Sequence, residues 1–234
     1  VLTGNEIFNQ GLVVYRRAGD QSRVECVGCD CSTLPGFEEA TRIDCPSGAI
    51  SPGLINPHDH ITYSVNAPAD HGDERYEHRQ DWRGGLRDHT ELNVPANDNN
   101  SGTAWGELRM VMGGATSIVG SGGVDGLLRN LDSDQEGLGL DEVFNSTFPL
   151  GDWSPILLAS GCDYGDFRDE PWETEDACAY LPHIAEGIDI EARNEYLCLS
   201  SDLDGGADVV SENTAIIHGI GLSALDVSDI EQNG

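Results

Sequence analysis

The stretch Ser51-Pro52-Gly53-Leu54-Ile55-Asn56-Pro57-His58-Asp59-His60 decides the fold expected for this chain. Its apolar run is closed by turn residues and is typical of a short extended segment. Side chains alternate along such a segment, so His58 and His60 point to one side and Asp59 to the other. Both imidazoles can therefore reach one metal ion. The alternative is a pair of surface histidines in an acidic loop.

Three later segments share with residues 51–60 a resemblance to the amidohydrolase superfamily, metal-dependent hydrolases built on a (β/α)8 TIM-type barrel. They are residues 113–119, 181–187 and 215–222, which resemble its second, fifth and sixth strands. The resemblance implies an α/β fold with about six βα units in residues 49–234. Residues 1–48 would form a small N-terminal β-sandwich segment. Alternation of strands and helices along the chain independently favours a parallel sheet or barrel.

The same resemblance implies a metal site and one acid-base residue. Its ligands would be the imidazole nitrogens of His58, His60, His183 and His218, and the ion one divalent transition metal, zinc or iron. Glu186, three residues after His183, would be the catalytic proton shuttle. The alternatives are a hydrogen-bonded core histidine at 183 and a solvated glutamate at a helix start. The chain has no lysine, so it cannot supply a carboxylated lysine bridge, and we expect a mononuclear site.

The activity implied is hydrolysis of a C–N bond in a small molecule by a metal-activated water, either opening a cyclic amide or deaminating a heterocycle. The family's strand-eight aspartate has no counterpart after residues 215–222. We therefore expect a C-terminal fragment of the same proteolytically processed precursor to complete the barrel, and a homo-oligomer is possible. The alternative is a catalytically degenerate fragment that serves as a binding or maturation partner.

Charge excludes some partners. Asp and Glu number 42 against 12 basic residues, all arginine, for a formal charge of -30. Such a field repels nucleic acid and anionic membrane surfaces. No apolar run approaches the ~20 residues that span a bilayer. The acidity also suits solubility in a salty medium.

Seven cysteines favour disulfides and an extracytoplasmic location, whether secreted, periplasmic or at the cell surface. We expect at least two disulfides, one of them within the region from Cys26 to Cys45. Plausible pairs are Cys31–Cys45, Cys26–Cys29 and Cys162–Cys178, although spacing does not fix connectivity. The alternative is a zinc module built on Cys26, Cys29 and Cys31.

The coarse pattern predicts where elements lie. Helices are expected at 105–112, 123–131, 188–199 and from Ser223, which has a capping acid at Asp226. Strands are expected at 12–15, 23–27, 115–119, 144–150, 155–159, 179–183 and 214–217. The polar stretch between His60 and Trp105 would lie over the barrel mouth as a long loop. Its three histidines, which are candidates to touch substrate, are His71, His78 and His89.

Overall fold

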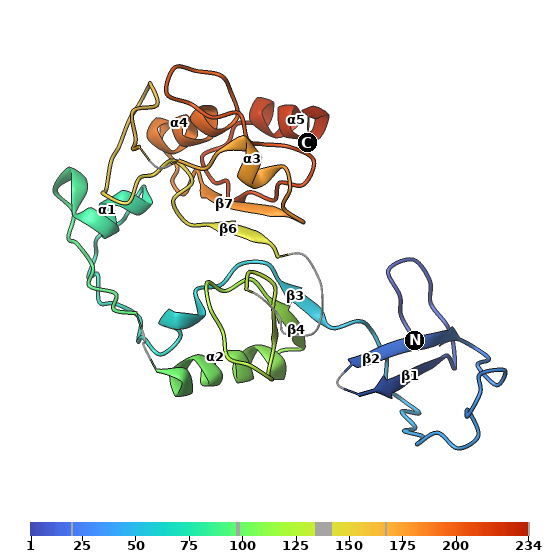
Figure 1. The fold of residues 1–234 in the computed structure, drawn as a ribbon. Coiled ribbons are helices and arrows are strands. Elements are labelled where there is room, and N and C mark those ends of the chain that lie inside the picture. The colour runs from blue at the N-terminus through green and yellow to red at the C-terminus, as the bar shows by residue number, and fades with distance from the viewer. Residues whose placement is uncertain (20, 97–98, 134–141, 167, 234) are drawn as a thin grey trace.

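The computed structural model describes residues 1–19, 21–96, 99–133, 142–166 and 168–233. The first elements in chain order are β1 (Leu12–Ala18), β2 (Gln21–Gly28), β3 (Leu54–Asn56), η1 (Ile61–Tyr63), α1 (Arg79–Gly84), η2 (Leu86–Asp88), α2 (Asn100–Met112) and β4 (Ala115–Ile118). They are followed by β5 (Arg129–Asn130), β6 (Phe144–Ser146), α3 (Pro171–Thr174), β7 (Tyr180–Ile184), α4 (Ile190–Leu199), β8 (Ile217–His218) and α5 (Ala224–Asn233) (Figure 1).

The N-terminal region contains one antiparallel hairpin, β1–β2, which pairs Leu12 with Gly28 and Ala18 with Gln21. Figure 1 shows the hairpin to one side of the βα elements. The strands expected at 12–15 and 23–27 are confirmed. The assignment of residues 1–48 to half of a β-sandwich stays a prediction.

Six short parallel strands form two sheets, in the orders β3-β4-β5 and β6-β7-β8. The backbone N–H of Val143, just before β6, donates to the carbonyl of Leu131, just after β5, at 2.8 Å. The two sheets therefore meet in sequence order. Neither sheet is closed into a barrel among the described residues, and the barrel stays a prediction.

Side-chain caps fix the helices beside these strands. The Asn99 side chain accepts the Gly102 N–H at the start of α2, and Asp189 accepts the Ala192 N–H at the start of α4. The capping box expected at α5 is present: Ser223 and Asp226 each accept the other's backbone N–H. Such caps satisfy N–H groups that have no partner within the helix.

The buried apolar residues form three clusters, one for each sheet and one between them. The largest lies around β7 and α4 and contains Leu150, Cys162, Tyr164, Tyr180, Ile184, Cys198, Leu199, Ala207 and Val209. A cluster of Ile61, Ile118 and Leu128 serves the β3–β5 sheet. The third joins Val119, which directly follows β4, to Leu181 on β7 and Ile217 on β8.

The helix expected at 123–131 is wrong. Residues 123–128 are irregular or in turns, and β5 follows them. Gly122 and Gly126 have φ values of 128° and 89°, which lie outside the helical region. The fully buried carboxylate of Glu107, on α2, accepts the backbone N–H groups of Val124 and Leu128 and holds the loop. The strand expected at 155–159 is also absent.

The expected number of disulfides is confirmed, but the expected pairs are wrong. Cys26 bonds Cys31, and Cys162 bonds Cys198, whose Cα atoms are 5.5 Å apart. Three cysteines of the described chain remain free and exposed, namely Cys29, Cys45 and Cys178. The second pair was missed because packing of α4 against the loop after β6 brings together residues 36 positions apart.

Candidate metal centre

Backbone pairing holds the His58-Asp59-His60 segment beyond the end of β3. The Asp59 N–H donates to the Val119 carbonyl at 2.9 Å, and the Ile61 N–H donates to the Gly120 carbonyl at 3.0 Å. The segment thus continues alongside β4. The Asp59 carboxylate accepts a hydrogen bond from the Asn56 amide at 3.1 Å.

His183 approaches the pair from β7, whose five residues are all buried. Its Nδ1 lies 3.0 Å from the Ser146 carbonyl oxygen at the end of β6. That contact selects the tautomer with the proton on Nδ1, which leaves Nε2 with a free lone pair. The free Nε2 lies 3.1 Å from Nε2 of His60.

Three imidazole nitrogens, from His58, His60 and His183, lie within 4.8 Å of one another. The Nε2 atoms of His58 and His60 are 3.4 Å apart. Two nitrogens at ordinary zinc distances in a tetrahedral site are separated by roughly 3.3 Å. The His58–His60 and His60–His183 separations therefore fit ligands arranged around one small cation, and an all-imidazole donor set suits zinc or iron.

His218 lies beside this group rather than within it. Its ring centroid is 4.8 Å from that of His58 and 5.5 Å from that of His183. Its Nε2 lies 3.3 Å from Oε2 of Glu186. The structure thus brings together all four predicted ligands and the predicted acid-base residue, with three ligands in one compact set and His218 next to Glu186.

Two residues at this centre have left-handed backbone conformations. Ala185, between His183 and Glu186, has φ of 54°, and His218 has φ of 73°. Such conformations cost a non-glycine residue about 1–3 kcal/mol and concentrate at functional sites. The strain turns the chain sharply at the ends of β7 and β8.

Burial keeps the imidazoles neutral. It lowers the pKa of His183 to about 3, aided by repulsion from His60 and His58, and lowers the pKa of His218 to about 4. The pKa values of His58 and His60 are also lowered, chiefly by burial. Neutral imidazole is the form that binds metals. Burial raises the pKa of Glu186, which suits a carboxyl group that takes up and releases a proton.

The loop histidines do not join the group. His89 pairs with Glu74 at 2.9 Å, and His71 contacts the Glu74 carbonyl oxygen. His78 is buried as the N-cap of α1. The predicted substrate contacts of these three histidines stay untested.

Sequence reasoning missed the buried charges beneath the centre. The side chains of Arg79, Asp152 and Glu195 are at most 2% exposed, and each of the two carboxylates lies within 4 Å of the Arg79 guanidinium. The only signal was the run of polar residues from His78 to Asp81 in a segment read as a solvated loop.

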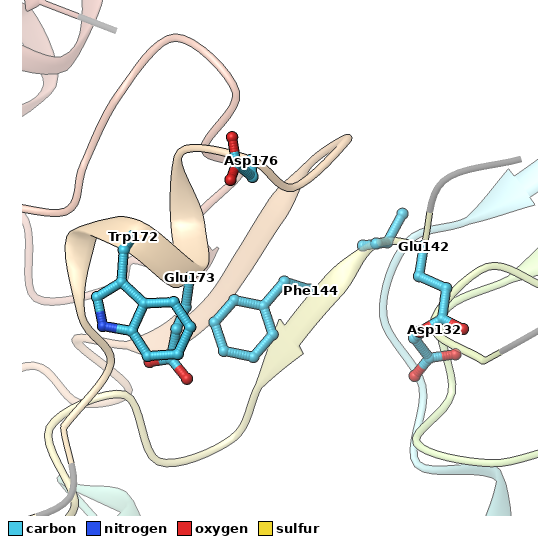
Figure 2. Close-up of a pocket in the computed structure, with 7 residues that line it drawn as sticks. Asp132, Glu142, Phe144, Trp172, Glu173 and Asp176 are labelled. Carbon is cyan, nitrogen blue, oxygen red and sulfur yellow. The ribbon is translucent and has the colours of Figure 1, made fainter.

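A hollow of about 490 Å³ lies elsewhere among the described residues. Figure 2 shows Trp172 and Phe144 on one side of it and Asp132 and Glu142 across from them. Glu173 and Asp176 add two more carboxylates to its wall. None of the histidines lines it, so it is separate from the candidate metal centre.

Comparison with models of known protein families gives no match, and neither do comparisons with curated proteins and with solved structures. No helix among the described residues is long and apolar enough to cross a bilayer.

Proposed function

We propose that this chain carries the metal centre of an amidohydrolase that cleaves a C–N bond in a small cyclic amide or deaminates a small heterocycle. The observation that carries the proposal is the group of three imidazole nitrogens from His58, His60 and His183, all within 4.8 Å. Two of the histidines come from the end of β3 and the third from β7. His183 is buried and His58 and His60 are half-buried, and removing polar imidazoles from water costs free energy unless they gain a binding partner.

The chemistry divides between the ion and the chain. A divalent transition metal would supply a Lewis acid and make water acidic enough to react near neutral pH. His58, His60 and His183 would hold that ion, with His218 alongside. Glu186, 3.3 Å from His218, would carry a proton to the departing nitrogen. Its raised pKa favours donation of that proton.

The proposed fold for this activity is the TIM-type barrel. The outer edges of β3 and β8 pair with no other strand among the described residues. Leu54 and Ile55 on β3 are 64% and 62% exposed, although parallel strands are normally covered on both faces. We propose that further parallel strands from another polypeptide segment cover these edges. Light scattering after size exclusion distinguishes that arrangement from a second copy of this chain.

The proposed location is extracytoplasmic. Two disulfides in the described chain are compatible with an oxidising compartment, because reducing compartments keep thiols free. Alkylation of the native protein with and without prior reduction measures how many of the seven cysteines are bonded.

Metal binding is the first prediction to test. Purified protein dialysed against zinc or iron should retain about one ion per chain. His183→Ala should lower affinity by at least about 100-fold, because it removes one of three converging ligands. His71→Ala, which alters an exposed histidine outside the group, should leave affinity unchanged. Wild-type protein without bound metal, or equal losses in both variants, contradicts the proposal.

A second candidate is a metal-binding partner without hydrolytic activity. Among the described residues, Glu186 is the only carboxylate with an oxygen within 4.0 Å of a ring nitrogen of the four histidines. A hydrolase of this kind would need another group to orient water. Assay of the metal-loaded protein against cyclic amides and aminated heterocycles separates the two, since turnover lost in Glu186→Gln supports the hydrolase. Tight metal binding without turnover supports the partner.

A further inference from the structure

The long loop after β3 is paired with the segment that carries His183 and Glu186. The Arg79 N–H donates to the Glu186 carbonyl at 2.9 Å, and the Ile188 N–H donates to the Glu77 carbonyl at 2.9 Å. Between them, His78 and Gly187 form an antiparallel bridge. Figure 1 shows α1, which begins at Arg79, beside the elements that follow β6. This stretch of the loop is therefore bonded through its backbone to the segment that directly follows β7.

The Arg79 side chain extends this pairing to two strand ends. Its Nη1 donates to the carbonyl oxygens of Thr147, after β6, at 3.0 Å and of His183, on β7, at 3.2 Å. Its Nη2 donates to Asp152 at 2.6 Å. A guanidinium presents five donors in a rigid plane, so one arginine can fix three acceptors at once. The contact at His183 is to the backbone of a proposed metal ligand.

Two buried carboxylates hold the guanidinium in place. The side chains of Asp152 and Glu195 are 0% and 1% exposed, and Oε1 of Glu195 lies 3.7 Å from Arg79 Nη2. Burial disfavours the charged form of Arg79, but Glu195 and Asp152 outweigh that effect and raise its pKa. Glu195 also accepts the N–H of Ala185, the strained residue between His183 and Glu186, at 2.9 Å. The cluster thus bonds the segment at two backbone groups: Arg79 donates to the His183 carbonyl, and Glu195 accepts the Ala185 N–H.

Four buried polar atoms in and beside the cluster form no hydrogen bond among the described residues: His78 Nε2, Arg79 Nε, Asp152 Oδ1 and Glu195 Oε1. Of these, His78 Nε2 and Glu195 Oε1 lie 3.4 Å apart. Unsatisfied polar atoms cost stability, and apolar residues of similar volume often replace buried ion clusters without loss. These charges bond the backbone of His183 and Ala185, which points to a role in placing this segment.

We infer that Arg79 is a positioning residue, which fastens the segment from His183 to Ile188 so that His183 and Glu186 are held ready for metal and substrate. The inference rests on the proposed function for the identity of what is positioned. The fastening itself is a property of the metal-free chain, and it can be measured without metal.

The test uses Arg79→Lys, which keeps the charge but replaces the planar fork by a single ammonium group. Hydrogen exchange followed by mass spectrometry on metal-free protein should show the amides of residues 183–188 exchanging at least about tenfold faster than in wild type. Cobalt affinity, read from its visible absorption, should fall by about 10–100-fold, as for other residues that orient metal ligands. Exchange in the β1–β2 hairpin should not change.

Two further variants complete the design. Asp152→Asn should accelerate exchange at 183–188 in the same direction but less, because an amide accepts a weaker hydrogen bond from Arg79. Arg193→Lys makes the same substitution in another arginine–carboxylate pair, with Asp226 at 2.7 Å, and should leave exchange and cobalt affinity at wild-type values.

The outcomes separate the two claims. Unchanged exchange at 183–188 in Arg79→Lys and Asp152→Asn overturns the positioning role, as does equal acceleration in Arg193→Lys. If Arg79→Lys fails to fold, Asp152→Asn against Arg193→Lys decides the question. Wild-type protein that binds no cobalt contradicts the proposed metal centre, while the exchange comparison still decides what Arg79 does.

Discussion

The two parallel sheets each supply histidines to the candidate centre, but they differ in how much of each sheet is buried. The β6–β8 sheet rests on a cluster of nine buried residues, and all five residues of β7 are buried. The β3–β5 sheet has a cluster of three, and two of the three residues of β3 are exposed. His183 is therefore held by a well-packed core, whereas His58 and His60 follow a strand of a sheet with a smaller core. Metal binding should restrain the β3–β5 side more than the β6–β8 side.

The largest expected effect compares the two cores directly. Ile184 on β7 and Ile118 on β4 are both 0% exposed. Ile184→Ala should lower the free energy of unfolding by about 4 to 5 kcal/mol, because the dense surroundings cannot collapse into the cavity. Ile118→Ala should cost about 2 to 3 kcal/mol, since its smaller cluster can relax. Urea denaturation of both variants measures the difference, and equal losses would show that cluster size does not matter here.

The next effect concerns the disulfide in the larger core. Cys162 and Cys198 are both buried and close a loop of 36 positions. Replacing both by alanine should cost about 3 to 4 kcal/mol, mainly by freeing the unfolded chain. The same change at Cys26 and Cys31, only five positions apart, should cost less and leave the βα region untouched. Thermal unfolding of the two double variants tests this, and a larger loss from the hairpin pair would reverse the ranking.

The smallest of the three effects lies where the sheets meet. The pKa of His183 is about 3 in the folded chain, against about 6.5 when unfolded. Below pH 6.5 the unfolded state binds a proton that the folded state does not, so stability contributed by neutral His183 falls as the pH drops towards 3. Between pH 7 and pH 5 this amounts to about 2 kcal/mol.

Metal-free wild type should therefore lose more stability over that range than metal-free His183→Gln, which cannot titrate at this position. Subtracting the two curves removes the contributions of groups that do not interact with His183. Parallel pH profiles would show that His183 is already protonated or exposed at pH 5.

The sequence predicted the elements with strong local signals. The runs at β1, β4 and β7, the helix α4 and the capping box of α5 are all encoded within a few residues. The five proposed site residues also meet as expected, because the ends of parallel strands collect at one edge of a sheet. Local sequence patterns could not predict contacts between residues that are far apart in the chain. The glycine-rich segment from 123 to 128 is held as a loop by Glu107, about twenty residues away.

The burial of these charged residues could not be predicted from the sequence for the same reason. From the sequence, Arg79 resembles an ordinary solvated loop residue. Its partners Asp152 and Glu195 are 73 and 116 positions away, and no neighbouring residue indicates them. The disulfide between Cys162 and Cys198 is likewise not indicated by any local sequence pattern. Polar residues in a long loop become informative only once their distant partners are known.

The separation of His60 and His183 along the chain has a consequence for biogenesis. Their nitrogens lie 3.1 Å apart across 123 positions. Contacts between residues so far apart in the sequence form late during folding, because the entropy cost of closing the long intervening loop precedes the stabilisation that the contact provides. At about 5–20 residues per second, the ribosome delivers His183 roughly ten seconds after His60. The first two histidines therefore wait in a nascent chain without their third, and the proposed three-histidine group can form only once synthesis has passed His183.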